Sequence, residues 1–332
     1  MIAAAQLPGI THSGGRWLTR CCVILCTVYV LTEDELRERL EPDRVITAIE
    51  SAFRDRYTSI VISARSHMNL AGGVFLIMAC YDGAGHALGI KLVVVQDRPQ
   101  QTDRVHATYM LLEPQTGAPK LIMPANYLTD LRTAATSALA TRLLSREDVR
   151  ILGVFGIGRL ARAHLRVLPL VRRFERILVC GRDSGETREF TQSMSSETDL
   201  PIEAVDPQLC AESDVVCTCT TSQTPLFDGN VLRAGTHLNL VGAFQPHSRE
   251  VDSNSVRRAR VFVETYDSAL AEAGDLVIPL QEGVIDRNHI AGDLHELVSG
   301  QTLGRIDPET VTIFKSVGCA LEDLATSELL ST

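Results

Sequence analysis

The chain has 332 residues, of which 45% are hydrophobic and 22% are charged, and its formal net charge is −9. This length exceeds one ordinary domain core, so we expect two domains, and the composition is typical of a globular protein. The acidic balance, with a pI near 5.5, argues against a nucleic-acid partner, because phosphate binding requires clustered lysine and arginine.

The cysteines and histidines indicate no metal chemistry. The nine cysteines show no metal-ligand spacing and no C-x-x-C pair, and the nine histidines include no H-E-x-x-H motif, so we expect no metal site and no metal-dependent hydrolase. Reduced, buried thiols are typical of a cytoplasmic protein. The apolar stretch 17–31 is interrupted by Arg20 and is too short to cross a bilayer. We interpret residues 1–27 as a poorly ordered extension and expect no association with a membrane.

The first 145 residues predict helices and an antiparallel sheet. A strand-like run over 23–31 precedes Thr32 and Glu35, whose capping-box spacing predicts a helix through Leu40, and apolar residues at helical spacing predict a second helix from 42 to about 57. Short β-rich runs between Gly, Asn and Pro turns predict an antiparallel sheet over 60–121. The stretch 126–144, rich in Ala, Leu and Thr, predicts a long buried helix that carries one conspicuous cation, Arg132.

Residues 150–245 alternate between strand and helix patterns. Such alternation implies right-handed crossovers and a parallel sheet with helices on both faces, so a nucleotide-binding domain is expected. Further strand-like and acidic helical stretches extend this pattern to about residue 304, and the tail over 307–330 is predicted to be helical.

One glycine motif indicates a dinucleotide. Gly156 and Gly158, with Arg159, Leu160 and Ala161 after them, follow an apolar strand and open a helix, which is the context that the G-x-G-x-x-G/A fingerprint requires. The first glycine permits the tight turn, the second lets the backbone approach the pyrophosphate, and the alanine keeps the helix close to the sheet. The amino terminus of the helix would direct unpaired N–H groups at the phosphates. A plain glycine-rich turn is the alternative.

The end of the next strand bears on which dinucleotide binds. An acidic residue commonly holds the ribose 2′-hydroxyl of NAD here, but the strand ends at Gly181. Arg182 beside it is suited to the 2′-phosphate of NADP, whereas Asp183 still argues for NAD. We therefore favour NADP(H) and leave NAD(H) open, and a solvated loop charge is the alternative for Arg182.

Six blocks, in order, resemble the ornithine cyclodeaminase and mu-crystallin family over residues 28–330. The blocks are LGIKLVV, LLEPQTGAPKLIM, NYLTDLRTAATSALAT, GVFGIGRLARAH, NLVGAFQPHSREVD and TVTIFKSVGCALEDLA. The resemblance implies an α/β homodimer with a discontinuous α+β domain for substrate binding and dimerisation, made of 28–145 and 305–332. A Rossmann NAD(P)-binding domain, 146–304, lies between these pieces.

The resemblance also implies that Arg65, Lys91 and Arg132 face the nicotinamide and bind the substrate carboxylate. A carboxylate taken out of water needs such cations, and an arginine inside an apolar helix is costly without a partner. Burial beside two arginines would lower the pKa of Lys91 toward the range of a proton donor, so Lys91 and Arg132 are the candidate catalytic residues. The alternatives are a structural ion pair for Arg132, a strand-edge lysine facing water, and a solvated charge for Arg65.

Other residues are placed around the cofactor by the same resemblance. They are small or polar, as expected where the backbone approaches a flat ring, and His106 is a further possible polar contact. The expected cofactor contacts are Thr218, Thr220, Thr221, Val241, Gly242, Ser316 and Gly318.

The chain departs from the family pattern at two positions. Cyclodeaminases carry an aspartate for the substrate amine where this chain has Phe244, and the ketimine reductase branch often has aspartate at His247. We therefore expect an NAD(P)H-dependent oxidoreductase of the C–N bond of a small α-imino or α-amino acid, of the ketimine reductase or amino-acid dehydrogenase type. The alternatives are an ornithine or lysine cyclodeaminase, which releases ammonia on cyclisation, and a non-catalytic, NADP-binding protein like mu-crystallin.

Overall fold

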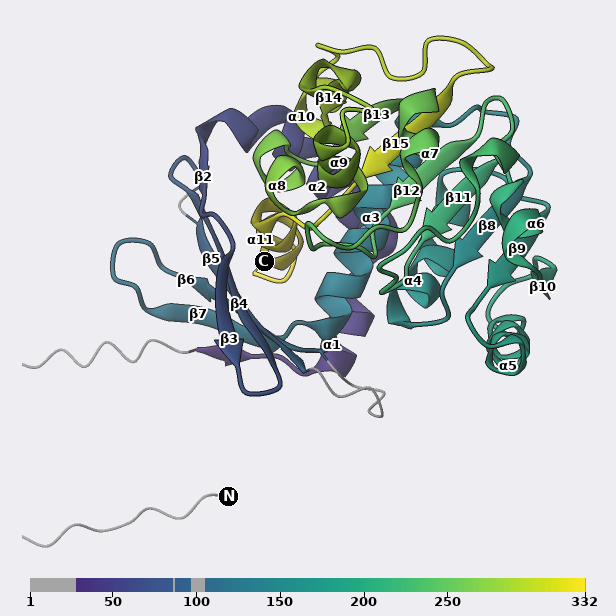
Figure 1. The fold of residues 1–332 in the computed structure, drawn as a ribbon. Helices are drawn as coiled ribbons and strands as arrows, with labels where there is room; N and C mark the ends of the chain where they lie inside the picture. Colours follow the sequence, from purple (N-terminus) through teal and green to yellow (C-terminus); the bar gives the residue numbers. More distant parts are fainter. Residues whose placement is uncertain (1–27, 86, 97–104, 332) are drawn as a thin grey trace, which may run out of the picture.

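The computed structural model describes residues 28–85, 87–96 and 105–331. These residues form two sheets with the long helix α3 (Asn126–Leu144) between them, so the predicted α/β class is confirmed (Figure 1). The proposed extension over residues 1–27, and most of the strand expected over 23–31, lie outside the described residues. None of the described helices combines the length and the apolar character that crossing a membrane requires.

The first sheet has seven strands in the order β1-β7-β6-β5-β4-β2, and β3 pairs with β4. Its pairs are antiparallel, as predicted, apart from the parallel pair β1–β7. Along β5 buried and half-buried side chains alternate, and Lys91 falls in the buried row. The strands are β1 (Tyr29–Val30), β2 (Ile60–Ile62), β3 (Ser66–Leu70), β4 (Gly73–Asp82), β5 (Ala87–Gln96), β6 (Val105–Leu112) and β7 (Pro119–Pro124).

Helices cover the inner face of this sheet. The predicted capping box begins α1 (Glu33–Arg39): Glu35 N donates to Thr32 Oγ1 at 3.3 Å, and Thr32 N donates to Glu35 Oε2 at 2.7 Å. The second helix, α2 (Pro42–Ser51), continues in one π-helical turn (Ala52–Arg56) and one 3-10 turn (Tyr57–Ser59). The last helix, α11 (Ala320–Glu328), packs on β4, β5, α2 and α3.

The second sheet has eight parallel strands in the order β10-β9-β8-β11-β12-β15-β13-β14. The chain reverses its direction across the sheet between β8 and β11, and ligands of such folds bind at the carboxyl ends of strands at that switch point. The strands are β8 (Ile151–Phe155), β9 (Arg176–Cys180), β10 (Ile202–Ala204), β11 (Val215–Thr218), β12 (His237–Leu240), β13 (Ala259–Val263), β14 (Ile290–Asp293) and β15 (Val311–Lys315).

Short helices flank the second sheet, and 3-10 turns occur over 168–170, 229–231 and 287–289. The helices are α4 (Arg159–Val167), α5 (Ser184–Met194), α6 (Pro207–Ala211), α7 (Ser253–Arg258), α8 (Tyr266–Glu272), α9 (Gly274–Gln281) and α10 (Leu294–Val298).

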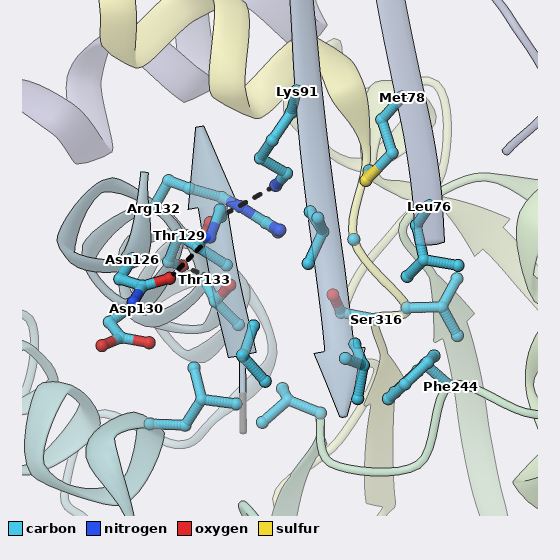
Figure 2. Close-up of a pocket in the computed structure, with 18 of the residues that line it drawn as sticks. Leu76, Met78, Lys91, Asn126, Thr129, Asp130, Arg132, Thr133, Phe244 and Ser316 are labelled. Atoms are coloured by element: carbon cyan, nitrogen blue, oxygen red, sulfur yellow. Dashed lines mark hydrogen bonds between the residues drawn. The ribbon is translucent and has the colours of Figure 1, made fainter. Parts of the chain in front are cut away.

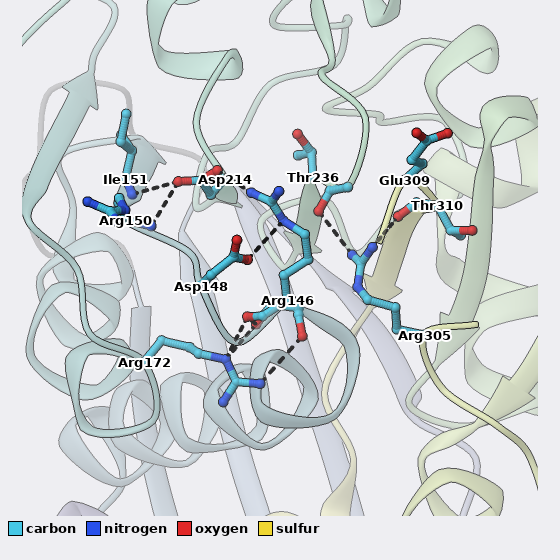
Figure 3. A network of polar contacts seen from close by, with 12 residues as sticks. Arg146, Asp148, Arg150, Ile151, Arg172, Asp214, Thr236, Arg305, Glu309 and Thr310 are labelled. Atoms are coloured by element: carbon cyan, nitrogen blue, oxygen red, sulfur yellow. Dashed lines mark hydrogen bonds and ion pairs between the residues drawn. The ribbon is translucent and has the colours of Figure 1, made fainter. Parts of the chain in front are cut away.

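The carboxyl end of α3 is held by arginines from the second half of the chain (Figure 3). Arg172 Nη2 donates to the carbonyl of Arg142 at 2.7 Å, and Arg305 Nε donates to that of Leu144 at 2.8 Å. Arg146 Nη2, just past the helix, pairs with Asp214 Oδ1 at 2.6 Å. Cations at a helix carboxyl end satisfy unpaired carbonyls and favour its dipole, so α3 is fixed against the second sheet.

The tail of the chain differs from the prediction. Residues 311–315 form a buried strand, β15, which inserts between β12 and β13, and only α11 is helical. The prediction of a helical tail was wrong for these residues, because a short apolar run has no visible period. The domain boundary expected at residue 305 would also separate β15 from its own sheet. We propose that the dinucleotide-binding domain extends to Lys315 and that α11 alone returns to the first sheet.

Candidate active site

A cavity of about 190 Å³ opens between the first sheet, α3 and the carboxyl edge of the second sheet. One wall is apolar and comes from β4, β5 and β6, with Leu76, Met78, Val93, Val95, Val105 and Ala107. Figure 2 shows Lys91 and Arg132 close together, with Leu76 and Phe244 across the cavity from them. Nine of the predicted site residues line this cavity: Arg65, Lys91, Arg132, Arg159, Leu160, Val241, Phe244, Ser316 and Gly318.

Lys91 reaches the cavity from the middle of β5. Its Nζ donates to Asp323 Oδ1 at 2.8 Å and lies 2.7 Å from Oδ2. A longer contact of 3.4 Å joins it to Thr129 Oγ1. Burial, and next the charge of Arg132, lower the pKa of Lys91 to about 8, although Asp323 opposes the shift. The amine can therefore gain and lose a proton near neutral pH.

Arg132 and Arg65 approach the same glycine from two sides. A Cβ atom on Gly318 would lie 3.0 Å from Arg132 Nη2 and 3.4 Å from Arg65 Nη2, and φ of Gly318 is +92°. Arg65 Nη2 donates to the carbonyls of Val317 at 2.7 Å and Gly318 at 2.9 Å, and its Nη1 lies 2.8 Å from Glu272 Oε2. The bare glycine thus leaves room for two guanidinium groups beside the cavity.

The acidic partners of these cations were missed by sequence reasoning. Arg132 Nη1 donates to Glu322 Oε2 at 2.5 Å, and its Nε donates to Asp323 Oδ1 at 3.0 Å. Both acids are fully buried in the first turn of α11. The available signal was two adjacent acids inside the apolar segment CALEDLA, because buried acids require partners. Arg132 therefore forms the structural ion pairs that were considered as the alternative to a role in the site, and it also lines the cavity.

Another acid that sequence reasoning missed, Asp130, lies on the cavity wall. Its Oδ2 is 3.3 Å from Arg159 Nε, and burial raises the pKa of Asp130 to about 6. It is a carboxylate on the wall formed by α3, away from position 244.

The glycine loop after β8 fits a dinucleotide. Gly156 has φ +108°, and a Cβ atom there would lie 2.6 Å from the carbonyl oxygen of Cys219. At Gly158, the amino-terminal cap of α4, a Cβ atom would meet nothing within 4 Å, so the backbone is open to a ligand. Ala161 is fully buried against the sheet. These are the three roles that the fingerprint assigns to its small residues.

The threonines at the end of β11 are tied to a buried acid, Glu250. Thr218 Oγ1 donates to Glu250 Oε2 at 2.8 Å, and Thr220 donates to Oε1 through its N at 2.8 Å and its Oγ1 at 2.7 Å. Gly242 N donates to Oε2 at 2.8 Å. Thr221 is exposed at the same strand end. The hydroxyls of Thr218 and Thr220 thus position loops inside the protein.

A buried ion pair lies beneath that acid. Lys315 Nζ donates to Asp275 Oδ2 at 2.8 Å and to the carbonyl of Ala243 at 2.6 Å. Asp275 Oδ1 accepts from Glu250 N at 2.6 Å. This network fixes the loop that carries Val241 and Phe244. Sequence reasoning missed all three charged residues, and only their presence in otherwise apolar segments could have indicated them.

Two more predicted cofactor residues lie past β9, outside the cavity. Asp183 Oδ1 accepts from the N atoms of Gly185 at 2.8 Å and Glu186 at 2.9 Å, which caps α5 and lowers the pKa of Asp183. Gly181 is half-buried. Arg182 is exposed and forms no hydrogen bond or ion pair with another described residue.

The two histidines considered earlier do not reach the cavity. His106 is exposed on β6, whereas its neighbours Val105 and Ala107 line the cavity, so the alternation of the strand directs it away. His247 is exposed on the loop after β12. Among the described residues, no group of three or more His, Cys, Asp and Glu side chains could hold a metal ion.

Comparisons with known proteins find similar proteins over most of the chain. The model of the ornithine cyclodeaminase/mu-crystallin family matches residues 27–331. A Δ1-pyrroline-2-carboxylate reductase of Bacillus cereus is 34% identical over 77% of this chain and 80% of its own, and mouse ketimine reductase mu-crystallin is 29% identical over 81% and 82%. The structure of Thermococcus litoralis Δ1-pyrroline-2-carboxylate reductase with NADH and L-proline has a TM-score of 0.88 at 34% identity, covering 92% of this chain and 96% of that one.

Replacing Gly158 by Ala tests the role of the glycine loop. The added methyl group meets no protein atom within 4 Å, so the thermal unfolding midpoint should stay that of the wild type. It occupies the space through which the pyrophosphate approaches the backbone, so the Kd for the dinucleotide should rise about tenfold or more. Fluorescence titration with the reduced dinucleotide measures this Kd, and unchanged affinity would contradict the assignment.

Proposed function

The chain belongs to the ornithine cyclodeaminase/mu-crystallin family, and we propose that it reduces the C=N bond of a small cyclic α-imino acid to give the amino acid. Its relatives include imino-acid reductases, and the chain is a nicotinamide-dependent oxidoreductase of the C–N bond. The observation that carries the proposal is the gathering of Arg65, Lys91 and Arg132 on one cavity that has an apolar wall and borders the glycine loop.

The cations would hold the substrate carboxylate. Arg65 and Arg132 present guanidinium groups beside Gly318, and a guanidinium matches the two oxygens of a carboxylate. Their other N–H groups already bond to acids and carbonyls, so the donors are fixed before a substrate arrives. Positioning of this kind lowers the entropic part of the barrier.

Lys91 would supply the proton to the imine nitrogen. Its pKa of about 8 leaves most of the group protonated at neutral pH, and Asp323 accepts a hydrogen bond from the ammonium. A bound nicotinamide would supply the hydride. The apolar side chains around the cavity exclude water from the reacting C=N bond.

The cavity wall opposite the cations favours a substrate with an apolar ring over a substrate with a second amino group. Phe244 lines the cavity where an acid for a substrate amine would be required, and its neighbours on the first sheet are aliphatic. Asp130 is the observation that favours the second candidate, an ornithine or lysine cyclodeaminase, because its carboxylate also lines the cavity. Its pairing with Arg159 leaves it less available for an amine.

We further propose a homodimer in the cytoplasm. The first sheet exposes large apolar side chains at both of its edges, Tyr29 and Val30 on β1 and Val61, Met68 and Tyr81 on β2, β3 and β4, and exposed apolar side chains of this kind are typical of an interface. The described cysteines are free thiols, which suits a reducing compartment.

NADP(H) is the proposed form of the cofactor. Asp183 is occupied in capping α5, whereas Arg182 is exposed and bonds to no described group. A free guanidinium beside the strand end suits a 2′-phosphate.

The direct test is NADPH and NADH oxidation with Δ1-pyrroline-2-carboxylate and Δ1-piperideine-2-carboxylate. We expect turnover that falls by about 100-fold or more in Lys91→Ala, as loss of a general acid does. The matched control is His106→Ala, on the other face of the sheet from Lys91. Conversion of ornithine or lysine to the cyclic amino acid, with no imine reduction, would replace the proposal by the cyclodeaminase.

The pH dependence of kcat identifies the form of Lys91 that acts. Its pKa lies below the usual 10.5, near 8, so the protonated donor is present below about pH 8 and is lost above it. We expect reduction to slow about tenfold per pH unit above that value, while the reverse oxidation, which needs the neutral amine, speeds up through the same range. A flat profile for both directions between pH 6 and 10, measured with saturating substrates, argues against Lys91 as the donor.

Replacing Arg182 by Ala tests the preference for NADPH. The loss of one charge-assisted contact should raise the KM for NADPH about tenfold and leave the KM for NADH unchanged. The control is Arg188→Ala, an exposed arginine later on α5. An equal effect on both cofactors, or none, would leave NAD(H) as the cofactor.

A further inference from the structure

Two buried carboxyl groups, those of Glu264 and Glu322, lie within hydrogen-bonding distance of each other behind Arg132. Glu264 follows β13 directly, and Glu322 lies in the first turn of α11, so their contact joins the second sheet to the last helix. Neither side chain is exposed to solvent.

Each of these carboxyl groups accepts a hydrogen bond from another residue through one of its two oxygens. Glu264 Oε1 accepts from Ser316 Oγ at 3.0 Å, and Glu322 Oε2 accepts from Arg132 Nη1 at 2.5 Å. The remaining oxygens, Glu264 Oε2 and Glu322 Oε1, are buried and accept no hydrogen bond from any described donor. Two hydrogen-bonded carboxyl groups that each keep a buried oxygen without a donor require a proton between them.

Electrostatics leads to the same requirement. Two carboxylates in contact and out of water cannot both ionise, because the like charges repel at low dielectric. Burial raises the pKa of Glu322 well above its usual range, and the charge of Glu264 raises it further, against the opposing effect of Arg132. The proton belongs to the pair rather than to either residue.

The titratable groups that surround the pair come from several elements: Tyr57, Arg132, Glu272, Cys319 and Asp323. Burial raises the pKa of the tyrosine and of the cysteine, so both are neutral near pH 7. The charged groups around the pair are therefore arginine and lysine cations and the carboxylates that form ion pairs with them.

This cluster of charged groups determines the net charge that the substrate carboxylate meets when it binds. It holds the cations of Arg65, Lys91 and Arg132 and four carboxyl groups, those of the pair and of Glu272 and Asp323. Fully ionised, it would carry one net negative charge and would repel the substrate carboxylate. With one proton on the pair, the cluster is neutral.

We propose that Glu264 and Glu322 share one proton, and that this proton sets the charge of the cation cluster that receives the substrate carboxylate. Glu264 is then a positioning residue for substrate binding. The shared proton itself rests only on the buried contact, whereas its effect on binding rests on the proposed function.

Infrared difference spectroscopy tests the shared proton on the whole protein without substrate. At pH 7 the wild type should show the C=O stretch of a neutral carboxylic acid, which both Glu264→Gln and Glu322→Gln abolish, because either leaves a single ionised carboxylate. The matched control is Glu272→Gln, in which the band should remain because that acid pairs with Arg65 alone in the cluster. Spectra in which neither pair variant loses the band overturn the proposal, whatever the enzyme reduces.

Kinetics tests the effect on binding. Glu264→Ala keeps the cluster neutral, but it leaves Glu322 Oε1 without a partner, so Glu322 holds Arg132 less firmly and the KM for the imino acid should rise about tenfold with a smaller change in kcat. Glu264→Gln should recover most of that loss, because a neutral amide donates the missing hydrogen and still accepts from Ser316. Recovery by Glu264→Asp but not by Gln would show that the site needs an ionised carboxylate at position 264, and would overturn the proposed role of the shared proton in binding.

Discussion

A guanidinium group in the middle of a buried helix must find its counter-charges on another element, and Arg132 of α3 finds them on α11. The last helix therefore has to return from the second sheet and pack on the first. There Asp323 forms ion pairs with both Arg132 and Lys91. Removal of one partner from such a pair leaves an uncompensated charge and costs about 3–5 kcal/mol. The same pairing orients the cations that line the cavity.

The side of the cavity that we propose for the cofactor depends on a comparable arrangement of buried charges. Glu250 gathers hydrogen bonds from the ends of β11 and β12, and the ion pair of Lys315 with Asp275 fixes the backbone that carries Glu250. Each half of the site is thus shaped by a fully buried carboxylate, Asp323 or Glu250, that does not line the cavity. Donors held by buried acids need little rearrangement when a ligand binds, which is how preorganised sites lower a barrier.

Local patterns were enough to predict much of this protein. The glycine motif, the bounds of α3 and the cation Arg132 follow from spacing and from the cost of a charge in an apolar segment, whereas Lys91 was identified through the family resemblance. The partners of those charges were not predicted, because Glu322 lies 190 residues from Arg132 and their meeting depends on tertiary structure. β15 was taken for helix for the same reason: its neighbours in the sheet, not its own five residues, make it a strand.

The position of β15 also bears on how the protein is made. It separates β12 from β13 inside the sheet, yet residues 311–315 follow both of those strands in the chain. While the ribosome is still synthesising the tail, the two neighbouring strands have no partner at that position, and their unpaired edges can recruit strands of other chains. The order of the strands in the chain therefore leaves the sheet open between β12 and β13 until β15 has been made.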